Sequence, residues 1–162
     1  MKVSLDISVP SRLWRGLPQA RAIARETIAA AVGESGARLR DGAEVSICLT
    51  DDDALRALNA RWRGIDKPTN VLSFPAADRD RRGDTPTLGD IALAYETLVR
   101  EAGDFGVPLA DHYRHLVAHG FLHLIGYDHE TDEEAERMEA LETRVLARLG
   151  AADPYARAVV GG

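Results

Sequence analysis

With 162 residues, 45% of them hydrophobic, the chain is long enough to bury one hydrophobic core and short for two domains. The single cysteine, Cys48, excludes an internal disulfide and thiolate zinc frameworks, so a metal site would consist of histidines and carboxylates. A net charge of −6 argues against nucleic-acid binding over a broad surface, and the absence of a signal-like or membrane-spanning apolar run predicts a cytoplasmic location.

The hydrophobic pattern alternates between periods typical of strands and of helices. In chain order it predicts a strand at 2–9, a helix at 17–32, a strand at 43–50, a helix at 51–64, strands at 69–75 and 89–95, and helices at 96–103, 109–125 and 132–149. The helix at 17–32 is expected to end before Gly33, and the helix at 51–64 is expected to end at Gly64.

This mixed order predicts an α+β fold with a small mixed four-stranded sheet and about five helices. No linker divides the chain, so residues 1–150 are expected to form a single layered domain. Residues 76–87 are charged and contain Gly and Pro, which predicts a mobile loop. Residues 151–162 are expected to form a flexible C-terminal tail.

Histidines are concentrated in the predicted helix at 109–125 and just after it. His115, His119 and His123 recur every four residues, so more than one H-x3-H pair can be drawn. Residues four apart on a helix lie on one face about 6 Å apart, whereas residues eight apart are separated by about 12 Å along the axis. His115 and His123 therefore cannot bind one cation together, and either pair needs a third ligand from elsewhere.

The stretch after this helix supplies that third ligand. Gly126 lies midway between His123 and His129, and glycine adopts the left-handed conformation that ends a helix and reverses the chain. A turn there returns His129 to His119 and His123, and H-x3-H-x2-G-x2-H is the ligand spacing of metzincin zinc sites. Three neutral imidazoles with one open position are typical of catalytic zinc, so we predict one zinc ion on His119, His123 and His129.

The residue after the first of these histidines differs from that of zinc proteases. Zincins carry a glutamate there as general base, but this chain has Gly120, which has no side chain. Glutamate-assisted peptide hydrolysis is therefore not available from this helix.

The block "HGFLHLIGYDH" at 119–129, followed by the acidic "ETDEEAERMEALE", resembles the YbeY family of bacterial rRNA maturation factors, described as single-strand-specific endoribonucleases. The upstream "LNARWRGIDKPTNVLSFP" and "LGDIALA" match other blocks of that family in the same order, so the resemblance runs over about 58–141. The resemblance implies zinc on the three histidines and an important arginine at Arg63. It also implies a cytoplasmic role in the processing and quality control of ribosomal RNA. One position differs, because the family usually has Asp where this chain has Asn70, which we expect to shape a turn.

From this resemblance we expect a zinc-dependent, single-strand-specific endoribonuclease acting in rRNA maturation, ribosome biogenesis and quality control. Ribosomal subunits and their proteins are expected as further partners. Binding to a membrane is not expected. Arg63 is expected to be catalytic, because its planar, permanently charged fork suits a phosphoryl group on which charge grows. The alternative is a surface arginine at a helix end, favoured there by the helix dipole.

The segment around Arg63 is locally basic. Residues 56–67 hold four cations (Arg56, Arg61, Arg63 and Lys67) against one carboxylate, Asp66. We predict that this strip follows the RNA backbone. A second basic cluster, Arg79, Arg81 and Arg82, is expected to be part of a solvated loop.

Three other side chains have two interpretations each. Trp62 and Phe74 are of a type that stacks on bases, but Trp62 shares the face of Leu55 and Leu58 and is expected in the core. Asp90 either orients a ligand histidine or shapes a strand end. Asp128 is expected to shape the turn before His129.

Two other functions remain open at this point. A metal-dependent hydrolase of peptides or small molecules agrees with the metzincin spacing but lacks the general base at Gly120. A zinc-stabilised, ribosome-associated RNA-binding factor is the other alternative. A fourth protein ligand closing the metal site would favour that factor, whereas a glutamate near the metal would favour the hydrolase.

Overall fold

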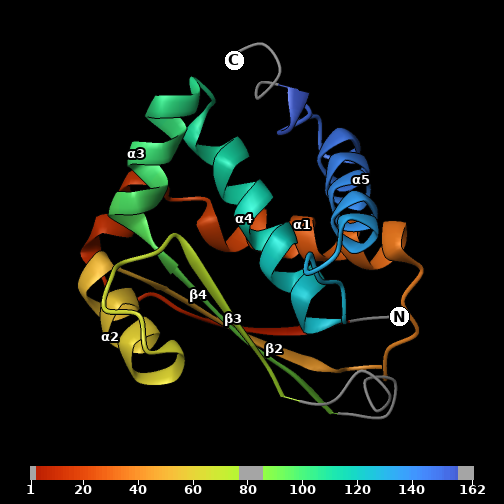
Figure 1. Ribbon diagram of the computed structural model, residues 1–162, viewed down its shortest axis with the longest axis horizontal. Helices are drawn as coiled ribbons and strands as arrows, with labels where there is room; N and C mark the ends of the chain where they lie inside the picture. Colours follow the sequence, from red (N-terminus) through yellow and green to blue (C-terminus); the bar gives the residue numbers. More distant parts are fainter. Residues whose placement is uncertain (1–2, 77–85, 157–162) are drawn as a thin grey trace.

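The structure, a computed structural model, describes residues 3–76 and 86–156 (Figure 1). Its elements are β1 (Ser4–Ser8), a short 3-10 helix (Arg12–Gly16), α1 (Ala20–Ser35), β2 (Glu44–Thr50), α2 (Asp52–Arg63), β3 (Val71–Pro75), β4 (Thr87–Ala94), α3 (Tyr95–Phe105), α4 (Leu109–Leu124) and α5 (Asp132–Arg148). The predicted order of strands and helices is confirmed. None of the helices described is long and apolar enough to cross a membrane.

The strands form one mixed, four-stranded sheet in the order β1-β2-β4-β3, as the α+β prediction required. The β1–β2 and β2–β4 pairs are parallel, and β3 runs antiparallel to β4. β3 is thus an edge strand of the sheet, and its Ser73 is paired with Ile91 of β4.

The two faces of the sheet are covered by different helices. Figure 1 shows α1, α4 and α5 on one side and α2 on the other. Successive residues of a strand point to opposite faces, and β4 follows this rule. Ile91 and Leu93 belong to the large core on the α4 side, whereas Ala92 and Ala94 pack with Leu55 of α2. The strand edge at β3 therefore lies between α2 and α4.

The predicted C-terminal end is confirmed for α2 but is wrong for α1. α2 begins and ends as expected, since the Asp51 side chain accepts a hydrogen bond from the Ala54 amide and Gly64 adopts φ 70°. α1, by contrast, does not stop before Gly33: it continues to Ser35 and ends at Gly36, which adopts φ 64°. The prediction at Gly33 was wrong because an isolated glycine inside a helix is tolerated at a modest cost in stability.

Candidate metal centre

α4 places His119 and His123 one turn apart on the same face. Their Nε2 atoms lie 3.1 Å from each other, and their ring centroids are 4.6 Å apart. Tetrahedral zinc with Zn–N distances near 2.0–2.1 Å needs nitrogens roughly 3.3–3.4 Å apart. The pair is therefore spaced for one shared cation.

The chain then reverses at Gly126, as predicted. Gly126 has φ 111°, a conformation that side-chain-bearing residues rarely adopt. The Tyr127 amide donates to the Leu122 carbonyl oxygen at 3.0 Å, which closes the end of the helix. The turn brings the His129 ring to 5.0 Å from His123 and 5.7 Å from His119, centroid to centroid. One nitrogen of each ring lies within 4.8 Å of the others, so the three histidines are able to bind a metal ion.

Hydrogen bonds at the outer nitrogens fix the orientation of two of these rings. His123 Nδ1 donates to the carbonyl oxygen of Tyr127 at 3.0 Å, and His119 Nδ1 lies 2.9 Å from Glu142 Oε1. A carbonyl and a carboxylate only accept, so both Nδ1 atoms carry the proton and both neutral rings present Nε2 lone pairs. Two lone pairs at 3.1 Å repel unless a cation lies between them, so the donor set fits a metal.

The electrostatics of the centre favour the neutral form of His123. Burial, together with the neighbouring His119 and His129, lowers the pKa of His123 to about 4. A histidine binds a metal only in its neutral form, so His123 is ready as a ligand at neutral pH.

Glu142 contacts a predicted metal ligand, and the sequence did not predict this contact. It is fully buried on α5, and its Oε1 accepts from His119 and, at 3.2 Å, from His115, while the Tyr155 hydroxyl donates to Oε2 at 2.6 Å. Burial on its own would raise the pKa of this carboxyl, but the hydrogen bonds from the two histidines outweigh burial and hold it at about 2. The signal was a charged residue four positions after Met138, on the apolar face of the helix.

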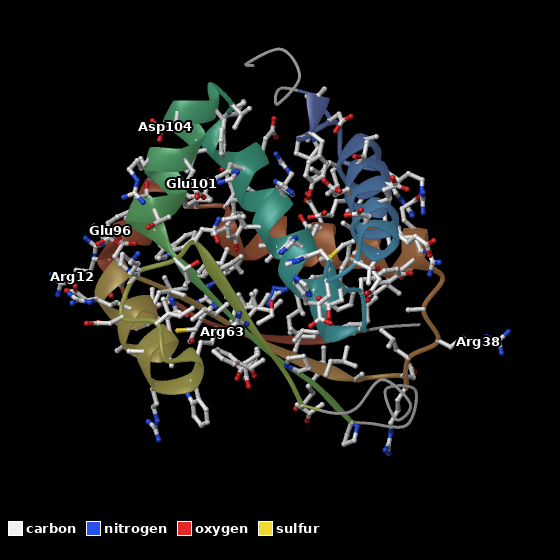
Figure 2. The ribbon with its side chains drawn as sticks, in the orientation of Figure 1. Arg12, Arg38, Arg63, Glu96, Glu101 and Asp104 are labelled. Carbon is white, nitrogen blue, oxygen red and sulfur yellow. The ribbon has the colours of Figure 1, made fainter. Side chains whose placement is uncertain are left out.

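The centre opens onto a cleft of about 1190 Å³. Its lining includes Arg63 from α2, Val71, Ser73 and Pro75 from β3, Glu101, Asp104 and Phe105 from α3, and His112 and His115 from α4. Asn70, directly before β3, also lines the cleft. Figure 2 shows Glu101 and Asp104 on α3, apart from Arg63, which lies toward β3. The α3 wall is thus acidic and the α2–β3 wall carries the cation.

Arg63, the last residue of α2, reaches the same cleft across the edge strand. Its Nη2 donates to the Ser73 carbonyl oxygen at 3.4 Å, and the Ser73 hydroxyl donates to the Gly120 carbonyl oxygen at 3.1 Å. Ser73 therefore connects the arginine to the turn of α4 that carries His119. The side chain of Arg63 is exposed and makes no ion pair among the residues that the structure describes.

Gly120 explains why the zincin glutamate is missing. A Cβ at this position would lie 3.0 Å from Ser73 Oγ and 3.1 Å from Ile91 Cγ2. The position faces the sheet, where α4 packs closely against β3 and β4. A side chain at this position would require Ser73 and Ile91 to move by a few tenths of an ångström, so it would crowd the contact between helix and sheet.

Three expectations about other residues need correction. Trp62 is 61% exposed and not part of the core, because the helix is short and its apolar face ends with Leu58 and Leu55. Arg56 pairs with Asp66, whose carboxylate accepts from the Arg56 Nε at 2.7 Å, so the exposed charge of the predicted basic strip is that of Arg61, Arg63 and Lys67. Asp90 is neither a partner of a ligand histidine nor at a strand end: it lies within β4, exposed, opposite Phe74.

Two residues that were expected to shape turns are hydrogen-bonded to the backbone next to them. Asp128 does shape the turn, because its Oδ1 accepts from the His129 amide at 2.8 Å. Asn70 lies directly before β3, where its Oδ1 accepts from the Val71 amide and its Nδ2 donates to Glu101. The Arg79, Arg81 and Arg82 cluster and most of the predicted loop lie outside the described residues.

The other histidines of α4 do not join the metal ligands. His112 Nε2 lies 2.9 Å from Glu101 Oε1, and His115 shares Glu142 with His119. Of the tail predicted at 151–162, residues 151–156 are described, and the Tyr155 ring packs edge-on against His115 with centroids 5.5 Å apart. Among the described residues no fourth His, Cys, Asp or Glu joins the three histidines.

The fold and site define a class of protein: an α+β layered domain in which three histidines that could bind a metal converge at a cleft. Comparison with known proteins identifies the family: residues 16–150 match the model of the family described as Endoribonuclease YbeY, and the chain belongs to that family.

Relatives from several bacteria support this assignment. The chain is 52% identical to the endoribonuclease YbeY of Methylocella silvestris over 155 residues, covering 96% of this chain and 87% of the relative. It is 55% identical to that of Nitrobacter hamburgensis, covering 93% of this chain and 81% of the relative. The fold is also similar to the solution structure of TM1509 from Thermotoga maritima, with 24% identity, a TM-score of 0.56 and coverage of 93% and 97% of the two chains.

Proposed function

We propose that this protein is a zinc-dependent endoribonuclease that cleaves single-stranded RNA during maturation and quality control of ribosomal RNA. One observation carries the proposal: three histidine nitrogens converge at the floor of a cleft whose rim bears Arg63. The relatives named as endoribonucleases support RNA as the substrate.

The ligand set favours zinc over harder cations. Imidazole nitrogens suit zinc, whereas magnesium and calcium prefer oxygen ligands. His119, His123 and His129 would hold one zinc ion and leave one position for water or a phosphate oxygen. When bound, zinc supplies Lewis acidity that polarises the phosphoryl group or activates a water molecule.

The residues of this chain have separate tasks in the reaction. Glu142 keeps His119 in the tautomer that presents Nε2, and the Tyr127 carbonyl does the same for His123. Arg63, proposed as catalytic, would contact the phosphoryl oxygens, on which negative charge grows whether water or the RNA 2′-hydroxyl attacks phosphorus.

Two features weigh against the other functions. Hydrolysis of peptides by the zincin route needs a glutamate at position 120, where this chain has glycine in close contact with the sheet. A purely structural zinc would be closed by a fourth ligand, and among the described residues none accompanies the three histidines. The proposal places the protein in the cytoplasm, where bacterial ribosomal RNA is processed, with ribosomal subunits as the setting.

The test uses protein with quantified zinc, incubated with a single-stranded RNA, the matching duplex and an unstructured peptide. The proposal predicts cleavage of the single strand, slow or no cleavage of the duplex, and an intact peptide. His119→Ala, which removes one ligand, should abolish RNA cleavage. Cleavage of the peptide but not of RNA would overturn the proposal.

A further inference from the structure

An exposed aromatic ring directly precedes Arg63, which lines the cleft, and lies on the side of the sheet away from α4. Trp62, in the last turn of α2, is 61% exposed. Trp62 contacts Phe74 of β3, with ring centroids 6.4 Å apart. The Arg61 guanidinium lies 5.1 Å from the centroid of the Trp62 ring. These two contacts leave most of the indole exposed, so its surface is accessible to a ligand.

The ring is adjacent to the wall of the cleft. Arg63 is the next residue in the chain, and Ser73 and Pro75 line the cleft on either side of Phe74. Because side chains alternate along a strand, Phe74 points to the opposite face of β3, toward Trp62. β3 is an edge strand, so a polymer that leaves the cleft across its edge meets Trp62 directly.

Charge favours this exit for a polyanion. The α3 side of the cleft carries the carboxylates Glu101 and Asp104, which repel phosphate. Around Trp62, Arg56 and Asp66 neutralise each other, which leaves the exposed Arg61, Arg63 and Lys67. Within the described part of the chain these three cations have no carboxylate partner. An RNA backbone is therefore attracted to the α2–β3 rim and repelled from α3.

We propose that one nucleotide of the bound RNA, beyond the nucleotides in the cleft, stacks its base on the indole of Trp62. Arg61 contacts the phosphate next to that base. Stacking on an aromatic ring is tolerant of sequence, since every base has a π face. The site would hold an unpaired base and not a paired one, so it selects single-stranded RNA. This inference rests on the proposed function, because it takes RNA as the ligand of the cleft.

The two tryptophans make the contact measurable. Trp14 is buried, 3% exposed, and its Nε1 donates to the Thr50 carbonyl oxygen, so its emission should not respond to a ligand at the rim. Zinc-loaded protein is titrated with a short 2′-O-methyl oligouridine, observed by stopped flow before turnover, and with the same backbone lacking bases. The oligouridine should quench the exposed tryptophan and the base-free backbone should not.

Variants separate stacking from attraction by charge. Trp62→Ala should weaken oligouridine binding roughly 5- to 100-fold, the range for one base stacked on an aromatic side chain. Trp62→Phe should retain most of the affinity while losing the quench. Val99→Ala, which trims an exposed apolar residue on α3, should bind like the unmodified protein.

Failure of this inference is distinguishable from failure of the proposed function. If Trp62→Ala binds and cleaves RNA like the unmodified protein, or the base-free backbone quenches equally, the stacking site is overturned and the nuclease remains. If the unmodified protein neither binds nor cleaves RNA, the proposed function fails and the inference fails with it. Quenching by an unrelated peptide in place of RNA would make the rim a protein-docking site and also overturn the inference.

Discussion

The two sides of the cleft differ in how firmly their side chains are held. At the histidine side, outer nitrogens of His119 and His123 are bound by Glu142 and by a backbone carbonyl, and Glu142 is itself fully buried. At the α2–β3 rim, Arg63 and Trp62 are exposed and make few contacts. A metal requires ligand atoms in a fixed geometry, whereas a flexible polymer is bound by groups that adjust to it.

The largest expected effect is a loss of zinc binding at the histidine side of the cleft, where the side chains are firmly held. His123→Ala removes one of the three converging nitrogens and should lose stoichiometric zinc, measured by metal analysis after dialysis. The matched control is His112→Ala on the same helix, whose ring is directed at Glu101 and away from the metal ligands. It should retain one zinc ion per chain even if its stability falls. Full zinc retention by His123→Ala would remove that histidine from the ligand set.

Arg63→Lys should have the next largest effect and tests whether the rim is more than a charged surface. Lysine keeps the charge but loses the bidentate fork, so turnover should fall by roughly 10²–10³-fold, as for a lost preorganised donor. Single-turnover cleavage at saturating protein, at two salt concentrations, measures this loss directly.

Other results for Arg63 would assign it a smaller role. A mild loss that grows with salt would mean that the arginine only attracts the backbone. Cleavage by Arg63→Ala at the rate of the unmodified protein would remove the arginine from the site.

A smaller effect is expected for Glu142→Gln, which keeps the shape of the side chain but removes the charged acceptor of His119. Loss of such a partner typically costs 10- to 100-fold in metal affinity, measurable by competition with a chromophoric chelator. Tyr155→Phe is the graded control, because it deletes one donor to Glu142 and leaves both histidine contacts. Unchanged zinc affinity in Glu142→Gln would show that the helix alone orients His119.

Local patterns in the sequence were sufficient to predict the three converging histidines, though not Glu142 beside them. Ligands four residues apart on a helix, followed by a glycine that permits reversal, place His119, His123 and His129 without knowledge of the rest of the fold. The sheet and the order of helices followed from periodicity in the same way.

The remaining features depend on tertiary packing. Glu142 is distant in sequence from His119, and only the packing of α5 on α4 brings them to 2.9 Å. Trp62 has the spacing of a core residue, but the apolar surface that α2 covers ends before it, so the ring stays exposed. Helical spacing shows which face a residue is on and does not show how far the neighbouring layer extends.

The central claim is that a single zinc ion on the three histidines is required for cleavage of RNA. The direct measurement is a titration of the metal-free protein with zinc, in which bound zinc and the single-turnover rate of single-stranded RNA cleavage are followed together. The account predicts that the rate rises in proportion to bound zinc and reaches its plateau at one ion per chain. Full cleavage without zinc, or one bound zinc ion without cleavage, would contradict it.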